Sequence, residues 1–468
     1  MKKLLLVLIL FAVQPLVFAQ NVYISGEGKD IKGKTVKLYS IADDISEKQK
    51  EEQVLKLSEE DSTFSFAITL SGERSVVVKI DFMSYSFVTK PGTKYHLQID
   101  NFSLSKEDSL LGLAYGKVLP CSLTMERYDG INLPMFDVDM VLNDFIVDNQ
   151  RLLFVKDSST IASLHSLKDS LIEIYKDNDY IKNYVIYSVA NVDYAFAIKS
   201  RASLKDSLFA HKPILYNNLA YTDCFKNIFS KYFSKGYKYI KRKDIENWLA
   251  SKNYNAFNDA LGRDKVLENE VFREFVFLQG MKDAYLDSYF DRKLVLQMLE
   301  QFVGITKFEA HKQIAQNLVD VLSNINAENS DIKDLEVKDI DGQKVPLNKF
   351  IKDKPLIVCF IRFDQEISLK EMEGVHFCYD SIKDYCDVLT ICCSDNYEKM
   401  YNFIKNNKVG NKYKWDFVYF DNNYDIFEKF HVRTFPTFIL INPEGKIVKN
   451  PMDSPSLGAL LTFKKKQQ

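Results

Sequence analysis

The sequence predicts a multidomain protein with an N-terminal β-sandwich, an α-helical middle region and a C-terminal α/β domain. Short alternating or apolar runs separated by polar turns indicate strands over residues 20–104. Apolar residues at helical spacing follow over residues 105–328, and strands alternate with helices over residues 331–468. The chain has 468 residues, 46% of them hydrophobic, which is enough for several packed cores.

Residues 1–19 have the three parts of a secretory signal peptide. Two lysines precede an apolar run from Leu4 to Val13, and small residues lead to a cleavage position after Ala19. This run is shorter than the about 20 apolar residues that cross a bilayer. We therefore expect a periplasmic or secreted protein with no integral membrane segment after cleavage; an uncleaved N-terminal anchor is the alternative.

The first two regions are predicted from periodicity. Strands are expected at 35–39, 64–68 and 76–80, and residues 87–99 form a strand, a Pro-Gly turn and a second strand. In the middle region the aromatic residues follow the helical spacing, which favours ordinary core over a ligand groove. The expected helices are 139–156, 160–176, 181–199, 222–235, 243–260, 268–303 and 306–325.

Charge and motifs argue against several classes of function. The 62 basic and 64 acidic residues give a net charge of -2, so no nucleic-acid partner is expected. The six histidines are scattered without metal-ligand spacing, and we find neither a nucleophile-elbow motif nor a phosphate-binding glycine loop. We expect no metal and no cofactor.

The C-terminal region begins after a polar stretch at 324–331. An entry hairpin is expected at 339–347, a buried central strand at 355–363, a helix at 369–385 and a further strand at 388–393. This order of elements is typical of an α/β domain.

Three segments of this region resemble the TlpA-like family of exported thiol-disulfide oxidoreductases. Residues 354–372 (KPLIVCFIRFDQEISLKEM) are similar to the strand-to-helix segment that carries the family's Cys-x-x-Cys pair. Residues 339–347 are similar to the family's lead-in, and residues 430–448 (FHVRTFPTFILINPEGKIV) to its closing hairpin. The resemblance implies a thioredoxin-like fold with a cis bond before Pro436, and it identifies 20–104 as the β-sandwich that precedes many such domains.

The active-site cysteines of that family are absent. Gln365 stands at the attacking cysteine and Ser368 at the resolving one. Disulfide exchange needs a thiolate that attacks sulfur and a second thiol that resolves the mixed disulfide. We therefore expect no catalytic residue here, and a redox-inactive binding or scaffolding protein of the cell envelope rather than an enzyme.

The resemblance also implies a peptide-binding surface around the altered turn. Its expected partner is an extended peptide or an envelope protein, and a decayed pocket that serves only as scaffold is the alternative. The surface comprises Asp364, Gln365, Glu366, Ile367 and Ser368 on one side and Phe435 and Pro436 on the other.

Two other functions remain open. The first is a thiol-disulfide oxidoreductase that uses cysteines outside the motif, although Cys359 lies six positions before Gln365 and the others are no better placed. The second is an envelope ligand-binding or assembly factor that acts through the aromatic helical region. The seven cysteines are Cys121, Cys224, Cys359, Cys378, Cys386, Cys392 and Cys393.

Overall fold

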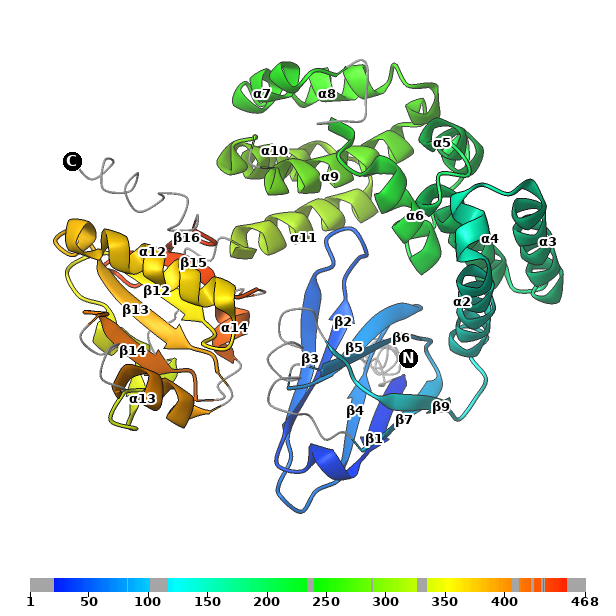
Figure 1. Cartoon of the computed structure of the whole chain (residues 1–468). Helices are drawn as coiled ribbons and strands as arrows, with labels where there is room; N and C mark the ends of the chain where they lie inside the picture. Colours follow the sequence, from blue (N-terminus) through cyan, green and yellow to red (C-terminus); the bar gives the residue numbers. More distant parts are fainter. Residues whose placement is uncertain are drawn as a thin grey trace, which may run out of the picture.

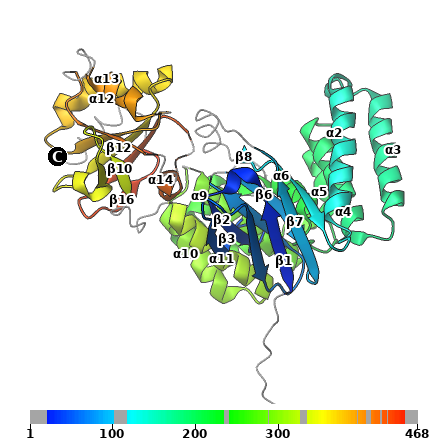
Figure 2. The ribbon, with the colours of Figure 1, turned by 90° about the horizontal axis from the view of Figure 1, so that it is seen from below.

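A computed structural model of the whole chain contains the three regions that the sequence predicts. Figures 1 and 2 show the helices arching over the N-terminal sheets, with the α/β domain on the opposite side from α2 and α3. The predicted signal peptide and the predicted boundary between 328 and 331 lie outside the described residues. The structure describes residues 21–452 except 82, 102–116, 234–239, 288, 326–334, 395, 406–411, 422–424, 431 and 433.

The N-terminal region is a sandwich of two sheets. Alternate residues of β1 and β2 point inward, Val22 and Ile24 from β1 and Val36 and Leu38 from β2, and they share one core. One sheet has the order β4-β1-β7-β9, with bounds Thr63–Ile68, Val22–Glu27, Thr93–Ile99 and Cys121–Met125. The other has the order β3-β2-β5-β6-β8, with bounds Gln49–Lys56, Thr35–Ile41, Arg74–Ile80, Met83–Thr89 and Lys117–Val118.

The sheets extend farther along the chain than the predicted boundary at 104. Strands β8 and β9 belong to this sandwich, so residues 117–125 are not part of the helical region as predicted. Strand β8 has two residues, and β9 alternates between half-exposed and exposed side chains at a sheet edge. Because neither strand buries a full apolar face, neither leaves a strand signal in the sequence.

The helical region contains more and shorter helices than periodicity predicts. Residues 243–260 and 268–303 each divide into two helices, because Asn253 and Asp291 accept backbone N–H groups and begin new helices. Helix α5 was not predicted. The bounds are α2 Asn132–Phe154, α3 Ser158–Ile174, α4 Asp179–Ala195, α5 Arg201–Phe209, α6 Leu219–Phe229, α7 Arg242–Ala250, α8 Tyr254–Leu261, α9 Glu270–Leu286, α10 Arg292–Ile305 and α11 Glu309–Ile325.

The aromatic residues of these helices form the core, as expected. Tyr221, Phe225, Phe229 and Phe275 are almost fully buried, and their rings contact one another or Phe209 at centroid separations of 4.3–6.0 Å. The aromatic stripe is therefore packing and not an open groove. None of the helices in the described part of the chain is long and apolar enough to cross a membrane.

The C-terminal domain has a seven-stranded sheet with the order β11-β10-β14-β13-β12-β15-β16. Strands β12, β13 and β14 are parallel, and β15 runs antiparallel to β12, which is the predicted α/β arrangement. The bounds are β10 Glu336–Lys338, β11 Lys344–Pro346, β12 Leu356–Ile361, α12 Glu366–Ile382, β13 Asp387–Cys392, α13 Tyr397–Lys405, β14 Asp416–Tyr419, α14 Asp425–Lys429, β15 Thr437–Ile441 and β16 Ile447–Lys449.

The β-sandwich and the helices are joined by the tip of the β2–β3 hairpin, residues 42–48. Asp43 accepts the backbone N–H groups of Ile45 and Ser46 and so shapes the tip. Ile45 is 1% exposed and belongs to the helical core, not to the sandwich core. Lys48 reaches α11, where its Nζ lies 2.5 Å from Asp320 Oδ2. The tip therefore fixes one region against the other.

Candidate functional site

The predicted site lies where the chain leaves the central strand β12 and enters α12. All six residues of β12 are buried, so the strand is held on both faces and presents its carboxyl end as a fixed edge. Strand β15 pairs with β12 in the register Phe360 to Thr437. Because Thr437 directly follows Pro436, the proline lies at the same edge of the sheet as the turn after β12.

An ion pair shapes that turn. Arg362 is 2% exposed, its Nε donates a hydrogen bond to Asp364 Oδ1 at 2.9 Å, and its Nη2 contacts Oδ2 of the same carboxylate. This pairing lowers the pKa of Asp364. Sequence analysis did not single out Arg362, although a charged residue at the end of a wholly apolar strand was the available signal. Arg362 is a positioning residue for this turn.

Gln365 and Ser368 meet in the structure. Gln365 is the N-cap of α12, and its side chain makes no capping hydrogen bond. Ser368 is fully buried, and its Oγ donates to Gln365 Oε1 at 3.5 Å and accepts the Arg362 N–H at 3.4 Å. The amide and the hydroxyl thus occupy the N-terminal turn of the helix, where a thiolate would be stabilised by the helix dipole. Neither group can exchange a disulfide.

Two other predicted residues of the turn face solvent. Ile367 is 58% exposed, and Glu366 makes an exposed ion pair with Lys370 at 2.8 Å. The first turn of α12 also carries backbone N–H groups that have no partner within the helix. This side of the turn therefore offers an apolar contact beside hydrogen-bond donors.

The other side of the predicted surface is the loop before β15. The bond between Phe435 and Pro436 is cis, as the resemblance implies. Phe435 is half-buried, and its ring packs edge-on against Phe427 of α14 at 5.8 Å. The Thr437 hydroxyl donates to the Thr434 carbonyl at 2.6 Å, which closes the loop. The loop and the turn of α12 are thus both present at one sheet edge, whereas their joint binding of a ligand stays a prediction.

None of the seven cysteines lies within this turn or in the first turn of α12. All seven are thiols and not disulfides, and all except Cys121 are buried. Cys359 in β12, Cys392 at the end of β13 and Cys393 directly after it are at most 1% exposed, which confirms their predicted place in the core. Burial raises the pKa of the Cys121, Cys224 and Cys386 thiols to about 12 and raises the pKa of Cys359, Cys378 and Cys393 as well.

These environments predict slow thiol chemistry in the native protein. A buried thiol with a raised pKa holds almost no thiolate at neutral pH, and the thiolate is the reactive form. We expect no thiol to react rapidly with an aromatic disulfide reagent at pH 7, and all seven to react once guanidinium unfolds the chain. Stopped-flow absorbance would measure how fast the thiols react in the folded and in the unfolded protein. One fast-reacting thiol in the folded protein would contradict this assignment.

Among the residues that the structure describes, no three His, Cys, Asp or Glu side chains are grouped so as to hold a metal ion. The comparisons with known proteins concern mainly the C-terminal domain. Residues 329–450 match the AhpC/TSA family. Comparison with the curated proteins gave no match.

Several solved structures are similar to parts of the chain. The thioredoxin domain of a thiol-disulfide oxidoreductase from Bacteroides vulgatus is 25% identical, with 28% of this chain and 91% of that chain covered and a TM-score of 0.25. A thiol:disulfide interchange protein from Bacteroides sp. is also 25% identical, covering 28% and 84%, with a TM-score of 0.25. A thioredoxin-like protein from Bacteroides caccae is 14% identical, covering 58% and 96%, with a TM-score of 0.32.

Proposed function

We propose that this chain, whose residues 329–450 form a thioredoxin-fold domain of the AhpC/TSA family, is a redox-inactive binding or scaffolding protein of the cell envelope. One observation carries the proposal: Gln365 and Ser368 contact each other in the turn between β12 and α12. By the family resemblance, these two positions correspond to the cysteines of a disulfide-exchange site, and here neither carries sulfur. A thioredoxin fold that lacks these two cysteines favours a binding function over electron transfer.

An oxidoreductase that uses other cysteines has less support. Cys359 lies within β12 and Cys378 lies in the fourth turn of α12, so neither is at the helix N-terminus. Cys392 and Cys393 donate to Ser394 Oγ and to the Ile391 carbonyl, at 3.3 and 3.5 Å. These thiols act as small core residues.

The binding surface that we propose combines the α12 turn with the cis-proline loop. Gln365 supplies an amide with donors and an acceptor, Ile367 supplies an exposed apolar contact, and the backbone beside Pro436 supplies pairing groups for an extended chain. An extended peptide or a segment of an envelope protein fits this combination. The proposed surface is Asp364, Gln365, Glu366, Ile367, Ser368, Phe435 and Pro436.

The proposed compartment is the periplasm or the exterior. The lysine-led apolar run ending at Ala19 supports export followed by cleavage. The intact mass of the exported protein should then be that of residues 20–468. A mass that includes residues 1–19 would contradict cleavage.

The binding proposal is tested with the mature chain and an unfolded probe that has no free thiol. Reduced and carboxymethylated ribonuclease, labelled with a fluorophore, should bind in fluorescence anisotropy. Ile367→Asp should weaken this binding roughly tenfold, because it places a charge on the apolar contact. The matched control is Val448→Asp on β16, an aliphatic residue that is 55% exposed in the same domain, and it should leave binding unchanged.

Two results would overturn the binding proposal. One is the absence of binding by the folded wild-type chain. The other is an equal effect of Ile367→Asp and Val448→Asp, which would mean that the probe is held elsewhere.

A further inference from the structure

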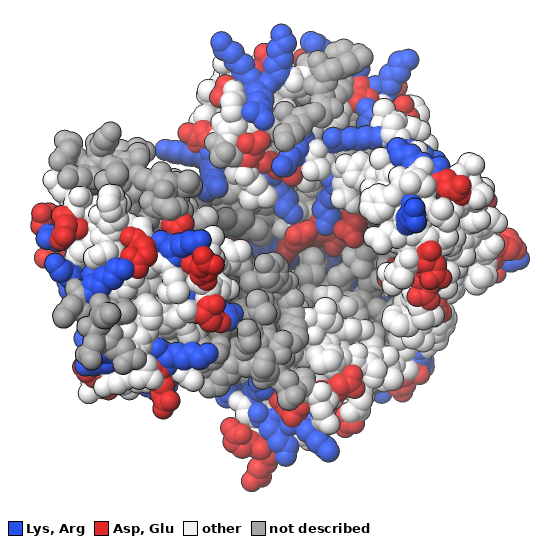
Figure 3. All heavy atoms as spheres, viewed as in Figure 1, with Lys and Arg blue, Asp and Glu red and all other residues white. Residues whose placement is uncertain are grey.

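A second candidate site lies between the β-sandwich and the helices. A pocket of about 420 Å³ is bounded by the face of β2, β5 and β6 on one side and by α2 and α6 on the other. Figure 3 shows acidic side chains gathered in the hollow below the helices. The tip of the β2–β3 hairpin, residues 42–48, forms one wall.

The polar part of this pocket carries an excess of carboxylates. Asp44, Glu47, Asp139 and Asp223 line it, against the single ammonium of Lys226. That ammonium is already engaged, since Lys226 Nζ lies 2.9 Å from Glu47 and 3.4 Å from Asp223. Glu47 also lies 3.6 Å from Lys282. Among the residues that line the pocket, Asp44 has only a share in the attraction of Lys226, and Asp139 has no cation.

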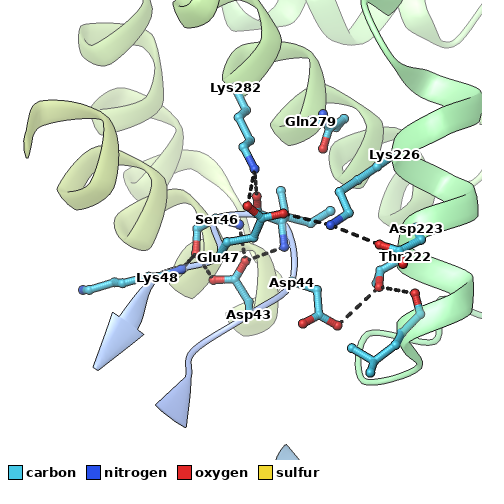
Figure 4. Close-up of polar contacts among 12 residues, drawn as sticks. Asp43, Asp44, Ser46, Glu47, Lys48, Thr222, Asp223, Lys226, Gln279 and Lys282 are labelled. Atoms are coloured by element: carbon cyan, nitrogen blue, oxygen red, sulfur yellow. Dashed lines mark hydrogen bonds and ion pairs between the residues drawn. The ribbon is translucent and has the colours of Figure 1, made fainter. Parts of the chain in front are cut away.

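Both of these carboxylates are held by neutral donors. Asp44 Oδ2 accepts a hydrogen bond from Thr222 Oγ1 at 3.3 Å, and Figure 4 shows it apart from the ion pairs of Glu47. Asp139 accepts the Tyr184 hydroxyl at 2.9 Å. Burial raises the pKa of Asp44 to about 6 and also raises the pKa of Asp139. A carboxylate in this state gains more from a cation than one in open water does.

The pocket also has an apolar part, which continues onto an exposed surface. Val77, Tyr85 and Phe87 come from the sheet, and Met135 and Phe136 come from α2. Phe136 is 64% exposed, and Leu133 and Met140 on the same helix are 47% and 48% exposed. The spacing of three and four residues places these three side chains in one stripe along α2. The apolar surface is therefore longer than the pocket.

We propose that this pocket binds the lysine or arginine side chain of an extended peptide whose neighbouring apolar residues lie on the α2 stripe. A basic side chain has an aliphatic stem that packs against Phe136 and Tyr85, and a charged head that reaches Asp44 and Asp139. The site is separate from the turn of α12, so this inference does not depend on the function proposed above.

The test uses the mature full-length chain and short synthetic peptides. The probe is a fluorescein-labelled peptide with one arginine between leucine and phenylalanine residues, and the comparison peptide has glutamine in place of arginine. Wild-type protein should bind the arginine peptide at least roughly tenfold more tightly in fluorescence anisotropy, as expected for a charge-assisted hydrogen bond. Equal binding of the two peptides, or no binding, would overturn the proposal.

Variants locate the binding. Asp44→Asn and Asp139→Asn should each lower the affinity for the arginine peptide roughly tenfold. The matched control is Asp148→Asn, which makes the same charge change at an exposed position of α2 outside the pocket and should have no effect. Asp44→Glu keeps the charge and should retain most of the affinity, which separates loss of charge from loss of folding. Wild-type affinity in both asparagine variants would overturn the site.

Arginine methyl ester tests whether the ligand is a peptide or a single basic molecule. Met140→Ala should weaken binding of the arginine peptide but leave the weak binding of arginine methyl ester unchanged, because Met140 lies on the α2 stripe outside the pocket, where only the peptide reaches. If the ester binds wild-type protein as tightly as the peptide does, the partner is a small amine and the peptide assignment is wrong.

Discussion

The variant Gln365→Cys with Ser368→Cys is expected to gain disulfide reductase activity. The two side chains already contact each other at the start of α12, and Pro436 lies at the same end of the sheet. At a helix N-terminus a thiol pKa falls from about 8.5 to about 7, which raises the thiolate fraction at pH 7 from about 3% to about 50%, roughly fifteenfold. Turnover of a model disulfide by the reduced variant should therefore clearly exceed that of wild-type protein.

The single variants are the controls for this gain. Gln365→Cys alone should form mixed disulfides without resolving them, and Ser368→Cys alone should be inert because residue 368 is fully buried. A folded double variant that neither turns over nor forms an internal disulfide would show that the turn has lost the geometry for exchange.

The largest expected loss of stability is for His311→Leu in the helical region. His311 is fully buried, its Nδ1 lies 2.9 Å from Glu274 Oε2, and its Nε2 lies 2.8 Å from the Tyr216 hydroxyl. Thr306 Oγ1 also donates to Glu274 at 2.6 Å. Removing the imidazole leaves the carboxylate of Glu274, which is 3% exposed, without its main partner. Breaking such a buried pair costs about 3–5 kcal/mol.

Urea unfolding followed by far-ultraviolet circular dichroism measures this loss, because most of the helix lies in the affected region. The double variant Glu274→Leu with His311→Leu is the control. It removes both polar partners together and should recover most of the free energy of unfolding, since no charge remains buried. If His311→Leu lowers the free energy of unfolding by less than about 1 kcal/mol, His311 and Glu274 are not a coupled pair.

Local patterns predicted the C-terminal domain well. Residues 355–361, within the predicted strand 355–363, are a continuous apolar run, and Leu356–Ile361 form the buried strand β12 as expected. The helix that follows begins at Glu366, three residues earlier than predicted, because residues 366–368 show no apolar periodicity. The cis bond before Pro436 followed from the family resemblance and from no property of the residues themselves.

Contacts between distant segments were not predictable in this way. Ile45 reads as an isolated apolar residue in a charged turn, and only the fold shows that it enters the helical core. Asp44 and Asp139 come from a hairpin tip and a helix that are far apart in the sequence, so their shared pocket leaves no motif. The burial of Arg362 was not predictable either, because it depends on the contact that the folded turn makes between Arg362 and Asp364.

The central claim is that this thioredoxin-fold domain does not exchange disulfides. Reduction of a model disulfide by the purified mature protein, with a chemical reductant to regenerate thiols, tests it most directly. We expect the turnover to equal that measured with the reductant alone, both for wild-type protein and for variants with serine at Cys359, Cys392 or Cys393. Turnover that exceeds this background and disappears in one of the cysteine variants would contradict it and would place the active site away from Gln365.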